Sequence, residues 1–412
     1  MIDPFGPNPI VLPCLSTEPL GSHIDAVGQR LSQQGYTSST VQYTMRILAD
    51  LSNWLQQHTL TAADFNEQLA GDFLQDRYRR CRPHRSDRAA LKQLLDHLRD
   101  QGVLPIQVVE TAPYASDPLI DDFQQYLLQQ RCLAPTTVTY YLDMVRHFLR
   151  ERFGTQPLNL RALGPQDVTR FIVQQAQRYS PSHAKLFVTA LRSFFRFLFQ
   201  RAMIAHDLAQ AVPTVPNWRL SILPRFMKAE EVDHLLQSVD RQTPQGQRDY
   251  AILLLLARLG LRAAEVVALT LEALDWEAGE LIVRSKGTRH HCLPLPHEVG
   301  EAVATYLCQG RPPVTTRRVF IRTRAPRRGF ANSQGISTIV RRALERAGLN
   351  PACKGAHLLR HSLATQRLQN GASLSEIGEL LRHQNLETTR IYAKVDQATL
   401  RTLAMPWPGG DA

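Results

Sequence analysis

Apolar residues in the first half of the chain recur mainly at spacings of three and four, which predicts amphipathic helices. Two such helices stand out, one after residue 40 and one after residue 137. Their recurring apolar residues are Met45, Leu48 and Leu51 in the first helix and Leu142, Val145 and Leu149 in the second. Ser39 or Thr40, and Thr136 or Thr137, are candidate N-caps for these helices.

These helices belong to an internal repeat. Residues 33–43 align with residues 130–140, and residues 91–98 align with residues 191–198 at nearly the same offset. Any two amphipathic helices align to some degree, but two blocks at nearly the same offset favour a duplication. We therefore predict two small all-helical domains of similar plan. The predicted N-terminal segments are a tail at 1–19, an extra helical domain at 20–108 and a second helical domain at 115–210.

A cluster of prolines follows the second helical domain. Pro213, Pro216 and Pro224 lack backbone donors and disfavour helix in the residue before each of them, which predicts an extended linker over 211–224. Residues 228–236 then open a new helical pattern with acidic residues in its first turn. We expect this last domain to span 225–400 and to leave a tail at 401–412.

A β-hairpin is expected inside the last domain. Two short apolar runs, 280–284 and 291–295, flank a glycine-containing turn at 285–287. The rest of the domain has helical spacing, so we predict an α+β domain with a small antiparallel β-hairpin or sheet. The whole chain is therefore expected to be mainly α, with helical N-terminal domains in front of this α+β domain.

Composition narrows the class of partner and the compartment. The 412 residues carry a formal net charge of +11, with a pI near 9.6, which suits a polyanionic partner without proving one. Six scattered cysteines without a CxxC pair indicate reduced thiols rather than disulfides or a zinc site. The first 15 residues do not resemble a signal peptide, and the apolar runs are too short to cross a bilayer. We expect a cytoplasmic protein without membrane contact.

Six residues in the last third of the chain have side chains suited to a phosphate diester. Cations stabilise the negative charge that grows in its transition state, and a tyrosine hydroxyl can hold a phosphoryl group covalently. The six candidate catalytic residues are Arg262, Lys286, His357, Arg360, His383 and Tyr392. No carboxylate or Cys/His metal cluster accompanies them, so the set predicts metal-free and cofactor-free cutting and rejoining of a nucleic-acid backbone.

Each of these residues alone also has a plain structural explanation. Arg262 could pair with Glu265 at the surface, and Lys286 could be a solvated turn lysine. Tyr392 could be an amphipathic packing residue. A histidine and an arginine three residues apart at a helix start share one face, which suits a helix cap as well as an anion site.

Taken together and in this order, the residues resemble the tyrosine recombinase (phage integrase) family. Residues 259–265 look like the family's box around its first arginine, and residues 285–288 look like its β-hairpin lysine turn. Residues 357–365 match the His-x-x-Arg box nearly throughout, and residues 380–392 match the final box. The resemblance covers about 115–400, where 115–210 is similar to the family's core-binding domain.

The resemblance implies a site-specific DNA recombinase that acts in integration, excision or transposition of a mobile element. Tyr392 would attack the phosphate and form a 3′-phosphotyrosine intermediate, and Lys286 would protonate the leaving 5′ oxygen. The residues that would hold the phosphate are Arg262, His357, Arg360 and His383. Strand exchange would take place in a homo-tetramer on double-stranded DNA, in the nucleoid. Other recombinases and accessory DNA-bending proteins are further candidate partners.

The chain departs from the family pattern at two places. Arg382 stands before His383, where the family usually has glycine, which raises the question of how His383 approaches the phosphate. The extra domain at 20–108 precedes the core-binding domain, and its role is open between binding DNA, contacting a partner recombinase and packing on its sister domain.

Six further arginines, without an acidic residue between them, are candidate contacts to DNA phosphates. They are Arg317, Arg318, Arg322, Arg324, Arg327 and Arg328. One alternative function is a non-catalytic, sequence-specific DNA-binding protein, because residues 373–394 can be interpreted as a helix–turn–helix with 386–394 as its recognition helix. That interpretation leaves the ordered catalytic set unexplained. A second alternative is a relaxing topoisomerase, which nicks and reseals DNA without joining two duplexes.

Overall fold

The computed structural model describes residues 19–105, 117–154, 156–216, 224–284, 290–383 and 385–395. These residues are mainly helical and include one three-stranded antiparallel sheet, which confirms the expected fold class. Backbone contacts divide the chain into two units, residues 107–221 and the remainder. We describe three regions separately: the N-terminal region (19–105), the middle region (117–216) and the C-terminal region (224–395). The domain boundaries expected from the sequence stay a prediction.

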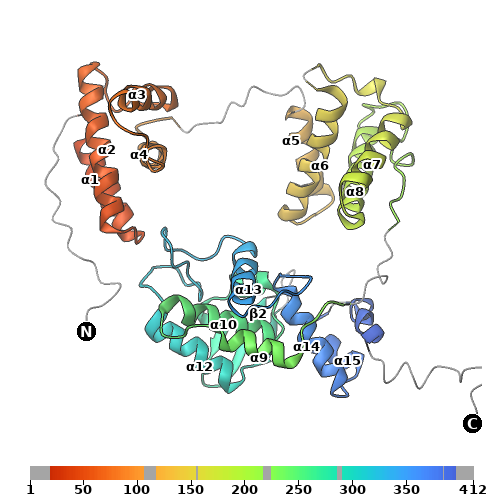
Figure 1. Ribbon diagram of the computed structural model, residues 1–412. Coiled ribbons are helices and arrows are strands. Elements are labelled where there is room, and N and C mark those ends of the chain that lie inside the picture. Colours follow the sequence, from red (N-terminus) through yellow and green to blue (C-terminus); the bar gives the residue numbers. More distant parts are fainter. Residues whose placement is uncertain are drawn as a thin grey trace, which may run out of the picture. The chain divides into compact units, whose positions relative to one another are not determined.

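The N-terminal region is a group of four helices around its own apolar core (Figure 1). The helices are α1 (Gly21–Gln33), α2 (Ser38–Gln57), α3 (Glu67–Arg80) and α4 (Asp87–Asp100). The side chain of Thr37 caps α2 by accepting a hydrogen bond from the Thr40 backbone N–H. The expected caps Ser39 and Thr40 therefore lie inside the helix, because α2 begins one residue before Ser39.

The middle region is also helical and has a core rich in phenylalanine. Its helices are α5 (Asp117–Gln125), which continues as the π-helical turn η1 (Tyr126–Gln130), then α6 (Pro135–Phe153), the 3-10 turn η2 (Leu160–Ala162), α7 (Pro165–Arg178) and α8 (Pro181–Gln200). Proline is the first residue of three of these helices. Its fixed φ suits this position, and its lack of an N–H costs no hydrogen bond, because an N–H there has no acceptor within the helix. Thr136 and Thr137 therefore follow Pro135 inside α6 and are not its caps.

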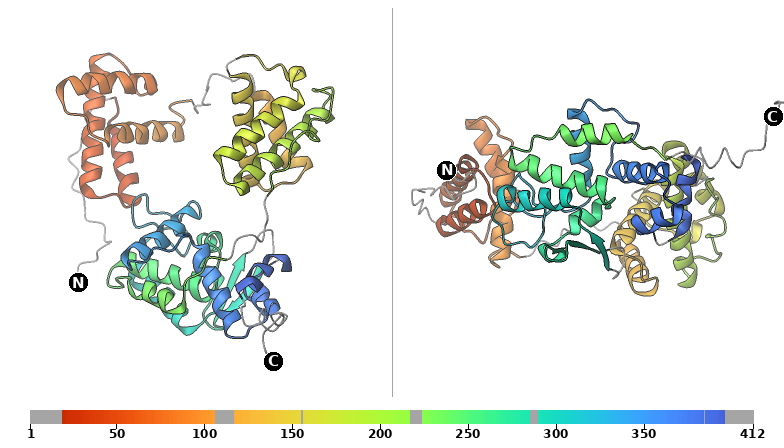
Figure 2. Two further views of the ribbon diagram at one scale, coloured as in Figure 1. Left: turned by 45° about the vertical axis from the view of Figure 1, so that its right-hand side comes forward. Right: turned by 90° about the horizontal axis from the view of Figure 1, so that it is seen from below.

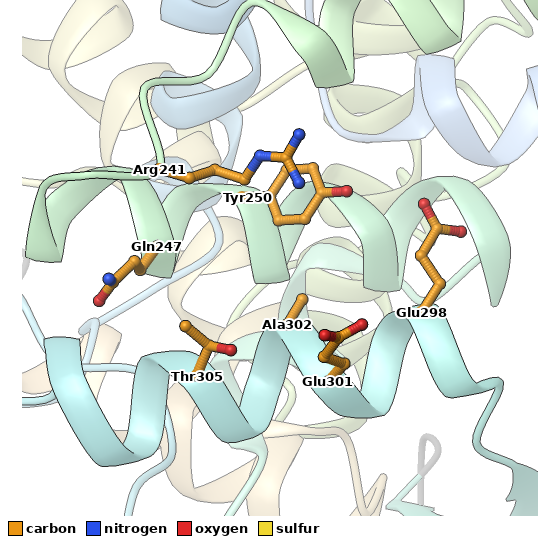
Figure 3. A pocket seen from close by; sticks show the side chains of 7 residues that line it. All are labelled: Arg241, Gln247, Tyr250, Glu298, Glu301, Ala302 and Thr305. Atoms are coloured by element: carbon orange, nitrogen blue, oxygen red, sulfur yellow. The ribbon is translucent and has the colours of Figure 1, made fainter.

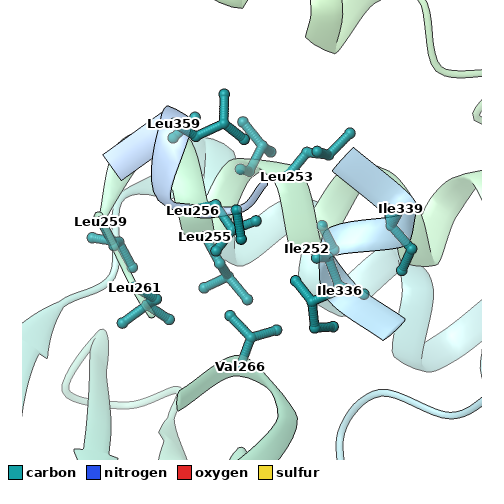
Figure 4. Packing of buried hydrophobic residues seen from close by; sticks show 14 of the residues in the cluster. Ile252, Leu253, Leu255, Leu256, Leu259, Leu261, Val266, Ile336, Ile339 and Leu359 are labelled. Carbon is teal, nitrogen blue, oxygen red and sulfur yellow. The ribbon is translucent and has the colours of Figure 1, made fainter. Parts of the chain in front are cut away.

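The C-terminal region is built around the apolar helix α10. Its helices are α9 (Ala229–Gln237), α10 (Pro244–Arg258), α11 (Ala263–Ala268), η3 (Leu271–Ala273), α12 (His297–Thr305) with the π-helical turn η4 (Tyr306–Gly310), α13 (Gln334–Arg346), α14 (His357–Gln369) and α15 (Leu374–Leu380). All residues from Ala251 to Ala257 are buried, so α10 has neighbours on every side. Figure 4 shows Ile336 and Ile339 of α13 and Leu359 of α14 packed around it.

The predicted hairpin is present within a three-stranded sheet. Its strands are β1 (Leu274–Asp275), β2 (Glu280–Arg284) and β3 (His290–Pro294), paired in the order β1-β2-β3. Leu281 and Val283 of β2 are buried, and the alternate residues Glu280, Ile282 and Arg284 are exposed. The short strand β1 was not predicted. The strands, drawn in green to teal in Figure 2, lie in the C-terminal region. The turn between β2 and β3, with Lys286, lies outside the described residues.

Some chemical features can be stated for the described residues alone. Five of the cysteines there are exposed free thiols, namely Cys81, Cys132, Cys292, Cys308 and Cys353. None of the helices in this part of the chain is both long and apolar enough to cross a membrane.

Candidate active site

Arg262 lies at a tight corner between α10 and α11. Gly260 has a φ of +57°, and a side chain there would lie 2.9 Å from Leu381 Cδ2, so the corner favours glycine on two grounds. Arg262 donates from its backbone N–H and from Nη1 to the carboxylate of Glu265, at 2.8 Å each. Its side chain is still 35% exposed. Pairing with Glu265 therefore fixes the guanidinium without burying it.

Arg360 joins this corner to two other elements. It lies on the first turn of α14 and is buried. Its guanidinium donates to the backbone oxygens of Gly260 and Leu381. Burial, together with the charges of Arg262 and Arg382, lowers the pKa of Arg360 to about 9. Arg360 is therefore a buried cation at neutral pH, positioned by backbone carbonyls instead of a carboxylate.

The two expected histidines lie close to these arginines. Burial, followed by the charges of Arg360 and Arg262, lowers the pKa of His357. The same causes lower the pKa of His383 to about 4. His383 Nδ1 lies 2.8 Å from Thr389 Oγ1, which fixes its ring. Both imidazoles are therefore neutral at pH 7 in the absence of DNA.

Tyr392 is buried and bonded to a histidine that is not among the six residues predicted from the sequence. Its hydroxyl lies 2.7 Å from Nδ1 of His361, and Tyr392 is only 1% exposed. Burial raises the pKa of Tyr392 to about 12, and the charge of Arg360 opposes this shift. Burial, with the charges of His357 and Arg360, lowers the pKa of His361 to about 4. A neutral imidazole therefore faces a protonated phenol.

The segment that carries Tyr392 is not the expected continuous helix. It consists of two 3-10 helices, η5 (Leu386–Thr388) and η6 (Arg390–Val395). Tyr392 packs with Ala364 and Leu368 of α14, with Ile377 of α15 and with Leu381, which follows α15. A capping box formed by Ser373 and Glu376 starts α15. The helix–turn–helix interpretation is wrong, because 386–394 forms no recognition helix.

Arg382 stands where the family usually has glycine, and its backbone keeps the conformation that glycine would favour. Its φ is +53°, in the left-handed region. Its buried side chain turns towards Glu265, and Nη2 lies 3.1 Å from Oε2 of that carboxylate. The backbone oxygen of Arg382 accepts a hydrogen bond from Arg262 Nη2 at 3.4 Å. The helix exit before His383 is thus kept at the cost of a strained residue, which its ion pair stabilises.

This conformation predicts an unusual order of stability. Arg382→Ala removes one partner of a buried ion pair and is expected to lower the free energy of unfolding by about 3 kcal/mol. The loss is no larger because Glu265 keeps Arg262 as a second partner. Arg382→Gly should be about 1 kcal/mol more stable than Arg382→Ala, because only glycine adopts a positive φ without strain. Urea unfolding of the full-length variants measures both differences.

The control for this comparison is Arg341, an exposed residue inside α13. There alanine should be the more stable replacement by about 1 kcal/mol, because glycine weakens a helix interior. If alanine is also the better replacement at position 382, backbone strain at Arg382 is not significant.

The six candidate DNA-binding arginines lie between η4 and α13, and the structure gives them different surroundings. Arg317 pairs with Glu272, and Arg318 donates to the backbone oxygen of Ala268. Arg322 and Arg324 line a hollow of about 400 Å³ together with residues of α10 and α13. The backbone oxygen of Arg328 accepts a hydrogen bond from the backbone N–H of Arg322. The backbone N–H of Arg327 also donates a hydrogen bond to a backbone oxygen. The role of these six arginines in DNA binding therefore stays a prediction.

A separate hollow of about 280 Å³ lies between α10 and α12 (Figure 3). Arg241 lies over the ring of Tyr250 at 4.5 Å, while Glu298 and Glu301 line the same hollow. Their carboxylates would repel a phosphate diester, so this hollow is unsuited to the DNA backbone.

Comparison with known proteins supports one interpretation of this site. A profile described as "Phage integrase family" matches residues 225–399, and one described as "Phage integrase, N-terminal SAM-like domain" matches residues 120–202. A Sinorhizobium fredii protein, y4rA, whose name describes an integrase/recombinase, is 44% identical over 392 residues, which cover 95% of each chain. Tyrosine recombinase XerC of Oceanobacillus iheyensis is 33% identical over 69% of this chain and 94% of its own length.

Solved structures share the fold. The XerH site-specific recombinase, in a post-cleavage complex with a palindromic difH substrate, has a TM-score of 0.56 at 18% identity, covering 71% of this chain and 97% of XerH. A lambda integrase fragment, solved as a dimer bound to a COC′ core site, has a TM-score of 0.52 at 17% identity, covering 67% and 94%. At these identities the likeness concerns the fold alone.

Proposed function

Since the chain belongs to the phage integrase family and is a tyrosine-type, site-specific DNA recombinase, we propose that it breaks and rejoins DNA through a covalent bond to Tyr392. One observation supports this assignment above the others. The hydroxyl of Tyr392 lies 2.7 Å from a neutral imidazole and within the electrostatic influence of Arg360. A buried phenol needs such neighbours to become a nucleophile, because its own pKa is too high at neutral pH.

In the proposed cleavage step, two arginines hold the scissile phosphate. Arg262 is exposed enough to reach a phosphate oxygen, and Arg360 provides a positive charge in a buried setting where that charge acts strongly. His357 and His383 add hydrogen bonds from the same side. The phosphate would restore the charge balance of a site in which Glu265 is the carboxylate that faces Arg262 and Arg382.

The bonds and protons of this step balance without a co-reactant. The Tyr392 oxygen attacks phosphorus, its proton passes to His361 Nδ1, and the bond from phosphorus to the 5′ oxygen breaks. The products are a 3′-phosphotyrosyl bond and a free 5′-hydroxyl, whose proton we assign to Lys286 by resemblance to the family. A 5′-hydroxyl from another strand can reverse the step, since the covalent bond keeps the energy of the ester.

Cleavage requires a change at Tyr392. The phenol is buried in the absence of DNA, so we propose that η5 and η6 shift when DNA binds and bring its oxygen to the phosphate. Two short 3-10 helices suit such a shift, because each holds few backbone hydrogen bonds. His361 would accept the phenol's proton when the shifted oxygen attacks phosphorus.

The proposed partner is double-stranded DNA, held by a homo-tetramer during strand exchange. Two solved proteins that share this fold are complexes with DNA: XerH with difH and lambda integrase with a core site. We propose that Arg317, Arg318, Arg322, Arg324, Arg327 and Arg328 contact phosphates. A cytoplasmic, nucleoid-associated recombinase of a mobile element, with other recombinases or DNA-bending proteins as partners, agrees with this function.

A pool of random-sequence duplexes, each with a nick, tests the function and selects the target sequence in one experiment. A nick beside the cleaved phosphate releases the 5′-hydroxyl fragment and traps the covalent adduct. We expect the DNA that stays attached after denaturation to converge on one sequence, and nuclease digestion to leave a phosphotyrosine at position 392. Two plasmids that carry the recovered sequence should then recombine.

Each other outcome identifies a different protein. DNA that binds but never becomes covalent indicates a non-catalytic DNA-binding protein. Adducts without a shared sequence, and plasmids that relax but do not recombine, indicate a topoisomerase.

A further inference from the structure

The N-terminal region separates its charges along the chain. Residues 77–92 contain seven lysines and arginines and one carboxylate. The rest of 19–105 contains three arginines and eight carboxylates. A region whose total charge is near zero thus concentrates its positive charge in one stretch. Like charges repel one another, so such a concentration favours a polyanionic partner.

The structure places this stretch at one corner, where α3 ends and α4 begins (Figure 1). We call it the α3–α4 corner and define it by its exposed arginines, which are Arg79, Arg80, Arg82, Arg85 and Arg88. Arg79 pairs with Asp76. The side chains of the other four have no hydrogen-bond or ion-pair partner among the described residues. By contrast, Arg30 and Arg99 of the same region pair with Asp100 and Glu67.

The one carboxylate in residues 77–92 forms no ion pair with these arginines. Asp87 is fully buried, and its oxygens accept hydrogen bonds from the Tyr43 hydroxyl at 2.5 Å and from the His84 backbone N–H at 3.0 Å. The same corner contains the start of α4, whose N-cap Ser86 makes no side-chain capping bond. Free N–H groups at a helix start add to the positive field around an anion.

The corner is unsuited to a protein partner. Protein interfaces depend on a few buried apolar or aromatic anchors. The large hydrophobic residues that are exposed in the described chain all lie outside 19–105, and the first of them along the chain is Leu128. Exposed arginines without exposed large hydrophobic residues beside them match phosphate oxygens, which a guanidinium can bind in pairs.

We propose that the α3–α4 corner is a second phosphate-binding surface, which contacts the DNA backbone beside the segment that residues 115–400 hold. The proposal rests on the proposed function, because the recombination reaction brings DNA to the chain. The y4rA protein aligns with 95% of this chain, whereas XerC aligns with only 69% of it. XerC therefore lacks a large part of what this chain and y4rA share. The corner therefore increases the affinity for DNA and the length of DNA that the protein contacts, while the cleavage chemistry belongs to the C-terminal region.

The salt dependence of binding tests this surface in the full-length protein. The variant R80Q/R82Q/R85Q/R88Q removes four exposed charges, and the matched control R80K/R82K/R85K/R88K keeps them. The probes are two duplexes with the recovered target sequence, one trimmed to the core and one extended on both sides. Each neutralised phosphate contributes about 0.9 to the slope of log K against log salt concentration.

On the extended duplex we expect the glutamine variant to lose about 2 to 3.5 from the magnitude of that slope, and the lysine variant to lose none. On the trimmed duplex all three proteins should have the same slope, and trapping of the Tyr392 adduct should be unchanged. An unchanged slope on the extended duplex overturns the proposal and assigns the corner to another partner. Absence of an adduct in the unmodified protein would instead contradict the proposed function.

Discussion

Tyr392→Phe is expected to abolish covalent attachment to DNA while the protein still folds and binds its target. Phenylalanine keeps the buried ring but has no oxygen to attack phosphorus. Removing a nucleophile costs a factor of at least about 10⁴ in rate, so no adduct should be detected on the nicked substrate. The lost hydrogen bond to His361 should lower the free energy of unfolding by only about 1 kcal/mol.

Tyr306 offers a matched control for this substitution. It is as buried as Tyr392, and its hydroxyl accepts a hydrogen bond from the Ile321 backbone N–H at 3.1 Å. Tyr306→Phe therefore removes a buried phenol oxygen and one hydrogen bond without touching the proposed chemistry. Its adduct yield should equal that of the unmodified protein. If both variants lose the adduct together, the loss reflects damaged folding and does not identify Tyr392 as the nucleophile.

Local sequence patterns predicted the parts of the site that depend on neighbouring residues. The helix start at His357 and the hairpin from 280 each follow from spacing within a few positions. The family resemblance then supplied an order and roles that no single segment specifies. These features could be predicted because each box forms one local turn or helix end.

The contacts that were missed depend on packing between distant segments. His361 and Tyr392 are 31 positions apart, and their hydrogen bond exists because η6 folds back on α14. A clue was available, because His361 follows His357 by four positions and so shares its helical face. The burial of Arg382 could not be foreseen, since its partner Glu265 is 117 positions away.

Glu265 organises the positive charge of the site. Burial acts to raise its pKa, but hydrogen bonds from Arg262 and the charges of Arg382 and Arg262 hold the pKa of Glu265 below its usual value. One carboxylate therefore fixes two guanidinium groups and leaves Arg360 without an acidic partner among the described residues. A site arranged in this way has an excess of positive charge that a phosphate diester can neutralise.

His361→Ala is expected to slow adduct formation by about 10²–10³-fold at pH 7, because the phenol of Tyr392 then has no base. In the unmodified protein, His361 is neutral above its pKa of about 4, so the rate at limiting DNA should persist down to about pH 5. In the alanine variant the proton must leave to solvent from a phenol with a pKa near 12. Its rate should therefore rise about tenfold per pH unit through neutral pH.

Two further variants separate proton transfer from positioning. His361→Asn places an oxygen near the position of Nδ1, so it can hold the phenol by a hydrogen bond but cannot take up its proton at neutral pH. We expect it to share the slow rate and the steep pH profile of the alanine variant. His234→Ala removes an exposed histidine that contacts the backbone oxygen of Ala347 and should leave the rate unchanged. If His361→Asn restores both the rate and the flat pH profile, His361 only positions Tyr392, and the proton leaves by another route.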